Sequence, residues 1–168
     1  MNPTIRPYTS ADLEPCRALW AALTDHHRTL YGDPTIGGAQ PGMYFDAHLK
    51  GVGAERLWVA EADGTVCGLV GLIVRGEEAE IEPIVVSVTH RGRGIGQGLL
   101  ARARQEAEAL QVRFLGVKPV ARNAEAMTFF YQAGFQLLGQ VELFMDLSSS
   151  SERIWEDGVT LHGHTFKY

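Results

Sequence analysis

The stretch from Val85 to Gly98 has the clearest chemical signature in the sequence. It reads Val-Val-Ser-Val-Thr-His-Arg-Gly-Arg-Gly-Ile-Gly-Gln-Gly, so an apolar run leads through glycines and arginines into a helical pattern. The first turn of a helix leaves backbone N–H groups without partners, and the helix dipole favours anions there. Arg91 and Arg93 add positive charge and paired hydrogen-bond donors for phosphate oxygens. The sequence therefore predicts a phosphate-binding loop.

The glycine spacing separates this loop from two common nucleotide-binding motifs. A P-loop ends in Gly-Lys followed by Ser or Thr, and the loop lacks that ending. A dinucleotide-binding fingerprint belongs to the first βαβ unit and is followed about 20 residues later by an acid. Here Gly92, Gly94 and Gly96 alternate in the middle of the chain, and residues 113–120 contain no acid. Both motifs are therefore poor descriptions of the loop.

The elements around this loop follow from the periodicity of apolar residues. Alternating or β-branched runs predict strands over 4–8, 57–62, 66–74, 80–88, 113–117, 137–147 and 159–167. Helical spacing predicts helices over 13–30, 43–52, 94–110 and 123–133. Asp63-Gly64 predicts a hairpin turn, Thr9 and Asp12 have the spacing of a capping box, and Asn123 and Gly134 are typical of the start and end of a helix. We expect one α/β domain, residues 1–168, with mixed strand directions.

Composition and charge exclude several classes of protein. The 168 residues are 45% hydrophobic and 21% charged, which is typical of a globular domain with its own core. The net charge of −5 argues against a uniformly basic surface for nucleic acid. The longest apolar run, residues 68–74, is far shorter than the ~20 residues of a membrane helix. Because the N-terminus has no apolar signal core, we expect a cytoplasmic protein.

Cysteines and histidines form no metal-binding pattern in the sequence. Cys16 and Cys67 lie far apart, and the six histidines lack acidic or thiol companions at ligand spacing. We therefore expect no metal site and two reduced structural thiols.

Residues 91–96, Arg-Gly-Arg-Gly-Ile-Gly, resemble the pyrophosphate loop of the GNAT superfamily of acyl-CoA-dependent N-acyltransferases. That loop has Arg or Gln, two further residues, Gly, one residue, and then Gly or Ala. The other segments that resemble the family are Ile5–Pro7, residues 81–86, Asn123–Ala126 and Phe130–Phe135. The resemblance covers residues 4–147.

The resemblance implies a three-layer α/β (α+β) fold. A central mixed, mostly antiparallel sheet is splayed open at the cofactor site and flanked by about four helices. Acetyl-CoA, the acyl donor, lies in the opening. Its pantetheine arm pairs with the strand before the loop, and its pyrophosphate binds N–H groups of the loop. The cofactor-binding residues implied here are Val86, Val88, Arg91, Gly92, Arg93, Gly94, Ile95, Gly96, Gln97, Gly98 and Asn123.

The resemblance also implies a catalytic pair. Glu82, on the strand before the loop, would accept a proton from the acceptor ammonium, whose pKa is near ~10 if it resembles lysine. Glu80 shares the same strand face by the period of two and is the alternative base. Tyr131 would donate a hydrogen bond or a proton to the departing CoA thiolate. Asn123 would cap its helix and also bind the pantetheine arm.

These features indicate an acetyl-CoA-dependent N-acetyltransferase, in which a primary amine attacks the thioester directly within a ternary complex. A CoA-binding sensor or interaction module without turnover is the alternative, and it would release no free thiol. The sequence leaves open the acceptor (a small molecule or a protein amine), the acyl chain length, and whether the chain forms a homodimer. Aromatic and acidic residues suited to a cationic acceptor are Asp25, His26, Tyr31, Asp33, Tyr44, Phe45, Asp46, Phe144 and Trp155.

Overall fold

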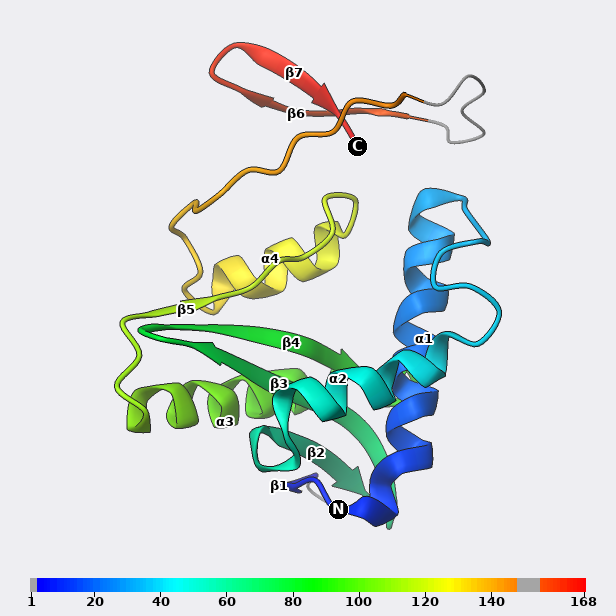
Figure 1. Ribbon diagram of the computed structural model, residues 1–168, viewed down its shortest axis with the longest axis vertical. Helices are drawn as coiled ribbons and strands as arrows, with labels where there is room; N and C mark the ends of the chain where they lie inside the picture. Colours follow the sequence, from blue (N-terminus) through cyan, green and yellow to red (C-terminus); the bar gives the residue numbers. More distant parts are fainter. Residues whose placement is uncertain (1–2, 148–154) are drawn as a thin grey trace.

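A five-stranded sheet forms the centre of the molecule (Figure 1). The computed structural model describes residues 3–147 and 155–168. In spatial order the strands are β1 (Thr4–Pro7), β2 (Leu57–Ala62), β3 (Thr65–Arg75), β4 (Glu78–Val86) and β5 (Phe114–Gly116). The first four strands pair antiparallel, whereas β5 runs parallel to β4. The expected mixed, mostly antiparallel sheet is confirmed.

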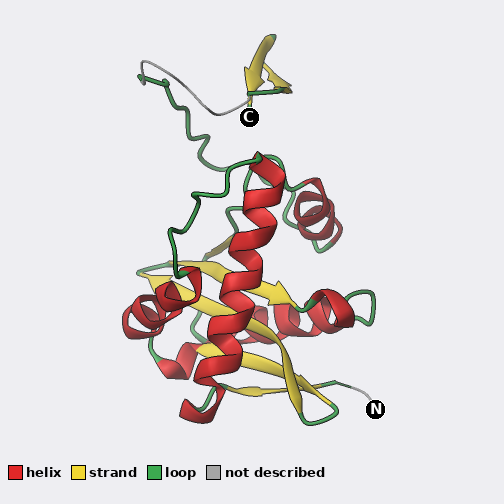
Figure 2. Cartoon of the chain, turned by 90° about the vertical axis from the view of Figure 1, so that its right-hand side faces the viewer, coloured by secondary structure: helices red, strands yellow, loops and turns green. Residues whose placement is uncertain are grey.

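Four α-helices in the described part of the chain cover the two faces of this sheet. They are α1 (Leu13–Tyr31), α2 (Tyr44–Val52), α3 (Ile95–Ala109) and α4 (Ala124–Gln132). Figure 2 shows the long α1 crossing in front of the sheet. Alternate residues of β2 divide between two apolar clusters: Trp58 packs with α3, and Leu57 packs with residues of α1 and α2. This arrangement confirms the three-layer fold.

The first helix is fixed to the sheet by a network of charged side chains. Asp12 accepts hydrogen bonds from the backbone N–H and the hydroxyl of Thr9 at 2.8 and 2.9 Å. Arg6 of β1 donates two hydrogen bonds of 2.8 Å to the same carboxylate and also pairs with Glu61 of β2. The guanidinium holds the pKa of Asp12 at about 2, well below its ordinary value. The predicted capping box is therefore confirmed, and it joins β1, β2 and α1.

Strands β4 and β5 diverge along their length. Strand β5 pairs only with Glu78, Ala79 and Glu80, so in the described residues the remainder of that edge of β4 carries no strand. Between Val70 and Leu72 the β3–β4 register shifts, which marks a β-bulge and increases the local twist. The open edge runs from Ile81 to Val86. It is the splayed opening that the resemblance to the GNAT superfamily implied.

The chain beyond α4 differs from expectation. The prediction of a strand over 137–147 is wrong, because these residues have no regular secondary structure and lie extended and exposed. A strand forms only when its backbone groups find a neighbouring edge, and this segment pairs with no strand of the part of the chain that the structure describes. The predicted strand over 159–167 is instead a hairpin of β6 (Asp157–Leu161) and β7 (His164–Lys167), which forms a sheet of its own.

Arg122 connects the C-terminal hairpin to the rest of the chain. Arg122, just before α4, donates to the backbone oxygen of Tyr168, and its Nη1 lies 3.8 Å from the Glu156 carboxylate. It also donates to the carbonyl of Leu30 at 3.2 Å and lies over the ring of Tyr31. The hairpin therefore meets the end of α1 and the start of α4 at this side chain. No helix among the described residues has the length and apolar character needed to cross a membrane.

Candidate active site

A cavity of about 460 Å³ lies where β4, α1, α3 and α4 converge. Strand β4 contributes three consecutive apolar residues, and the glycine-rich loop and the first turn of α3 contribute residues from His90 to Gln97. The lining residues are Leu23, His26, Ile84, Val85, Val86, His90, Arg91, Gly92, Gly94, Ile95, Gly96, Gln97, Asn123, Glu125, Ala126, Phe129 and Phe130. The structure thus brings the predicted loop, the strand before it and Asn123 into one site.

The start of α3 forms the polar end of this cavity. Gly94 immediately precedes the helix with φ of +77°, a left-handed conformation that favours glycine. Helix geometry leaves the N–H groups of Ile95, Gly96 and Gln97 without intrahelical partners. A Cβ added to Gly96 would lie 3.6 Å from Phe129, so the glycine leaves space on the cavity wall. These N–H groups and the helix dipole make the loop suited to a phosphate group.

The arginines of the loop are placed differently from one another. Arg91 lines the cavity, where its Nη1 lies 3.6 Å from Glu125 and its Nε donates to the carbonyl of Val86 at 3.3 Å. Arg93 is exposed, lies outside the lining and donates to the carbonyl of Thr89 at 3.3 Å. Of the two, Arg91 is the better placed to meet an anion in the cavity.

Gly98 does not belong to the ligand-facing surface. Its N–H already donates to the carbonyl of Gly94 at 3.0 Å, as the first hydrogen bond of the helix. A Cβ added there would lie 2.6 Å from Cδ1 of Ile5 on β1. Gly98 therefore allows close packing of α3 against β1, and its predicted place in the cofactor set is corrected.

The open edge of β4 forms the apolar wall of the site. Ile84, Val85 and Val86 line the cavity. Val88 does not continue the strand: it begins a 3₁₀ turn (Val88–His90), and its carbonyl accepts from the N–H of Arg91 at 3.4 Å. Strand-like pairing with a ligand is therefore available at Val86 but not at Val88.

The two candidate bases on β4 have different surroundings. The Glu80 side chain is 12% exposed and accepts hydrogen bonds from Arg75 at 3.1 Å and Lys118 at 2.7 Å. Glu82 is exposed and lies at the bulge, where Ile81 and Ile84 pack in the same apolar cluster, so its side chain is on the opposite face of β4 from Ile84. Glu80 is thus held in ion pairs, and Glu82 is the carboxylate accessible to a substrate.

The two predicted contacts on α4 differ in position. Asn123 caps the helix through a hydrogen bond of 2.9 Å from the N–H of Ala126, and it also lines the cavity. Tyr131 is 62% exposed and lies outside the lining, although its neighbour Phe130 is part of it. The structure brings Asn123, but not Tyr131, to the cavity.

Helix α1 supplies cavity residues that the loop motif did not indicate. Leu23 and His26, one turn apart, face Val85 and Val86 across the site. Beside them, burial and then the neighbouring His26 lower the pKa of His27, which favours its neutral form. The three-residue spacing of Leu23 and His26 on a predicted helix was the available signal, but it did not distinguish a cavity wall from ordinary core.

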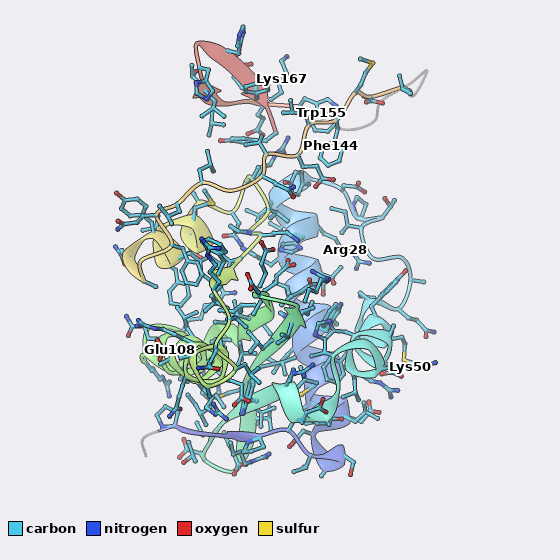
Figure 3. The ribbon with its side chains drawn as sticks, turned by 60° about the vertical axis from the view of Figure 1, so that its left-hand side comes forward. Arg28, Lys50, Glu108, Phe144, Trp155 and Lys167 are labelled. Atoms are coloured by element: carbon cyan, nitrogen blue, oxygen red, sulfur yellow. The ribbon has the colours of Figure 1, made fainter. Side chains whose placement is uncertain are left out.

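The residues predicted to contact an acceptor are scattered. Phe45 is fully buried in the core, and Asp25 and Asp46 pair with arginines of α1. Phe144 and Trp155 lie together near the C-terminal hairpin, away from the sheet (Figure 3). Only His26 of that group lines the cavity.

Comparison with known proteins supports what this geometry indicates. The family model described as the acetyltransferase (GNAT) family matches residues 18–135. The chain belongs to the GNAT family. A streptothricin acetyltransferase from Escherichia coli is 36% identical over 66 residues, which are 39% of this chain and 37% of that enzyme. The chain therefore matches little more than a third of the length of this curated relative.

Solved structures of GNAT proteins share the fold. A GNAT acetyltransferase from Staphylococcus aureus Mu50 superposes with a TM-score of 0.69 at 14% identity, covering 90% of this chain and 96% of that one. AAC(6')-Iy, solved with the bisubstrate analogue CoA-S-monomethyl-acetylneamine, gives 0.64 at 18% identity, covering 88% and 100%. At these levels of sequence identity, the similarity shows a shared fold and nothing more.

The GNAT family uses acetyl-CoA, and the donor set of the cavity fits its chemistry. The free N–H groups of Ile95, Gly96 and Gln97, with Arg91 beside them, suit the pyrophosphate. The apolar edge at Ile84–Val86 suits the pantetheine arm. Among the described residues there is no cluster of three His, Cys, Asp or Glu side chains arranged to hold a metal ion.

Proposed function

We propose that this chain transfers an acetyl group from acetyl-CoA to a primary amine, by direct attack of the amine on the thioester. The observation that carries the proposal is a convergence at one cavity. The phosphate-binding start of α3, the open edge of β4 and the cap of α4 all line the same space. A single extended ligand with a pyrophosphate at one end and an amide-bearing arm satisfies all three features.

The cofactor is held by backbone groups more than by side chains. The pyrophosphate accepts hydrogen bonds from the first-turn N–H groups of α3, with Arg91 as the charged partner. The pantetheine amides pair with the edge of β4 at Ile84 and Val86, as an added strand would. Asn123 lines the same channel and is the side-chain contact that we assign to the arm.

The chemistry needs one proton acceptor and one thiolate partner. The amine nitrogen forms a bond to the acetyl carbonyl carbon, and the C–S bond of the thioester breaks. The proton of the ammonium goes to the Glu82 carboxylate, directly or through water. The CoA thiolate leaves, and we keep Tyr131 as its proposed hydrogen-bond donor from α4. Holding amine and thioester together supplies much of the acceleration.

For the acceptor we propose a cationic small-molecule amine. The similarity to a streptothricin acetyltransferase and the fold shared with AAC(6')-Iy support this class. Glu82, an exposed carboxylate two residues before Ile84 of the cavity wall, also favours a cationic group.

The decisive experiment measures thiol release with acetyl-CoA and a panel of amines. The panel contains streptothricin, neamine, glutamate and a peptide with an N-terminal alanine, and calorimetry measures CoA binding in parallel. We expect CoA binding together with thiol release for at least one cationic amine. CoA binding without thiol release for any amine would favour the sensor alternative, and absence of CoA binding would overturn the whole proposal.

A matched pair of glycine variants tests the position of the cofactor. Gly96→Val places a branched side chain where the pyrophosphate approaches the helix, and we expect CoA affinity to fall by on the order of 100-fold. Gly51→Val is the control, because Gly51 is also helical and a Cβ added there meets nothing within 4 Å. Equal CoA affinity in the two folded variants would place the phosphates elsewhere.

A further inference from the structure

His48 lies on the core-facing side of α2, at a position where an apolar side chain would be expected. The buried residues Phe45 and Val52 lie three positions before it and four positions after it, so all three side chains share one face of the helix. The His48 ring packs on the Trp20 ring of α1, with centroids 5.0 Å apart and planes at 46°. Its Nε2 is buried and has no hydrogen-bond partner among the described residues. Because a buried polar atom without a partner is costly, packing alone does not explain a histidine here.

The sheet beneath this helix is irregular. Helix α2 crosses over β3 (Figure 1), and at the register shift one residue of β3, Gly71, lies opposite two residues of β4, Glu82 and Pro83. Such a bulge bends the strand and redirects a side chain. The exposed Glu82 side chain lies on the opposite face of β4 from Ile84, which is the side of the sheet where α1 and α2 pack. The bulge therefore sets the direction in which the proposed base projects.

Gly71 shows how close His48 lies to this bulge. A Cβ added to Gly71 would collide with the carbonyl oxygen of Glu82 and would lie 3.1 Å from Nε2 of His48. The carbonyl oxygen and the imidazole nitrogen thus border the same small space, which a glycine leaves open. Burial lowers the pKa of His48, and the Glu82 carbonyl beside it partly opposes that change. The ring is therefore neutral at pH 7, so one of its two nitrogens carries a proton and can donate it in a hydrogen bond.

We propose that His48 is a positioning residue for Glu82, and that it acts by donating a hydrogen bond from Nε2–H to the Glu82 carbonyl. The inference rests on the proposed function, in which Glu82 is the base. The bond satisfies the buried nitrogen and holds the bulge in one geometry, while packing on Trp20 limits rotation of the ring. Since the carboxylate and the carbonyl belong to the same residue, fixing the main chain of Glu82 fixes the point from which its side chain reaches the acceptor amine.

Two substitutions of His48 separate this role from simple packing. His48→Leu keeps an apolar side chain against Trp20 but has no donor, and we expect kcat for an accepted amine to fall by on the order of 10- to 100-fold. The KM for the amine and the affinity for CoA should change little, because His48 lies outside the cavity lining. His48→Gln places an amide N–H at a similar distance from the backbone and should restore most of kcat. Equal losses in the Leu and Gln variants would overturn the proposal.

The same substitution in a Glu82→Gln background shows whether the effect passes through Glu82. If His48 only positions this carboxylate, His48→Leu should cause no further loss of kcat once the carboxylate is gone. An undiminished loss in that background would overturn the proposal. A wild-type rate for Glu82→Gln alone would remove the base itself, whereas a loss for Glu82→Gln and none for His48→Leu would overturn only the role of His48.

Nitrogen NMR of the whole chain, labelled with ¹⁵N-histidine, tests the hydrogen bond without any activity. At pH 7 we expect His48 to be neutral, with the proton on Nε2 and with slow exchange of that proton with solvent. The signal is assigned by its loss in His48→Gln. The exposed His164 serves as the control, and its ring protons should exchange rapidly. A His48 ring that is protonated on Nδ1 alone, or that is charged at pH 7, would overturn the proposal even if the acetyltransferase activity is confirmed.

Discussion

In the body of the molecule (residues 3–135) apolar side chains pack on one another, whereas in residues 137–147, the tail segment, they are exposed to solvent. Trp58 and Leu69 of the sheet are fully buried, while Leu137 and Leu147 are almost fully exposed. Both regions show clear apolar alternation in the sequence. The difference shows that alternation in the sequence identifies the apolar face of a segment. It does not identify what, if anything, buries that face in the folded structure.

The largest expected effect lies in the body, at the proposed base. Glu82→Gln removes the proton acceptor, and we expect the rate to fall by roughly 100- to 10,000-fold near neutral pH. Activity should recover partly at high pH, where free amine becomes abundant. A pH–rate profile with an accepted amine measures this, and Glu142→Gln makes the same change in the tail segment as a control. Profiles of Glu82→Gln and wild type that differ only by a constant factor would remove Glu82 from proton transfer.

A glycine pair compares packing in the two regions. Gly98→Val forces a side chain against Ile5, and overpacking of this kind costs about 1–3 kcal/mol of unfolding free energy. A Cβ added at Gly139 in the tail segment meets nothing within 4 Å, so Gly139→Val should leave urea unfolding of dilute protein unchanged. If Gly98→Val is as stable as wild type but binds CoA poorly, the glycine faces the ligand after all.

The Arg6–Asp12 network makes the unfolding free energy of the body depend on pH. The pKa of Asp12 is about 2 in the folded protein and 3.8 when unperturbed, so its stabilisation is complete above pH 4 and is lost as the pH falls toward 2. Asp12→Asn should therefore lower the unfolding free energy by about 2 kcal/mol at pH 7. Urea unfolding at pH 7 and at pH 2 measures the difference between the variant and wild type. A difference that persists at pH 2 would assign the effect to lost packing and not to charge.

The smallest effect is expected at Leu138 in the tail segment. Leu138→Ser changes an exposed side chain, so unfolding of the body should shift by no more than about 0.5 kcal/mol. Thermal unfolding at low protein concentration checks this. A larger loss would show that the tail segment packs on its own body, and it would weaken the contrast between the two regions.

Sequence patterns predicted the body because each of its elements carries its own local signal. The capping residues Thr9 and Asn123 and the hairpin turn at Asp63 were recognisable without any tertiary information. The loop motif likewise predicted Gly94 and Gly96 at the cavity. The motif could not distinguish Gly98 from the glycines at the cavity, because Gly98 continues their alternate spacing in the sequence although it packs against a neighbouring strand.

Other features of the site depend on tertiary packing. The choice of Glu82 over Glu80 follows from Lys118, which is distant in sequence and reaches Glu80 only across the sheet. His26 enters the cavity because α1 crosses β4, and no local pattern reports that crossing. The exposed position of Tyr131 is likewise set by how α4 rotates on its neighbours, so its predicted role as thiolate partner remains a prediction.

The open edge of β4 also determines how its amides behave in solvent. The N–H of Ser87 points toward β3, where it donates to Cys67 at 2.8 Å. Strand residues alternate their N–H direction, so Val85 also points toward β3, while Ile84 and Val86 point outward. We therefore expect the outward amides of the ligand-free protein to exchange their hydrogens with deuterated water much faster than Val85 does. With acetyl-CoA placed along this edge as proposed, we expect exchange to slow at Ile84 and Val86 and to stay unchanged at Val85, so that the strand reports cofactor binding in the absence of any acceptor.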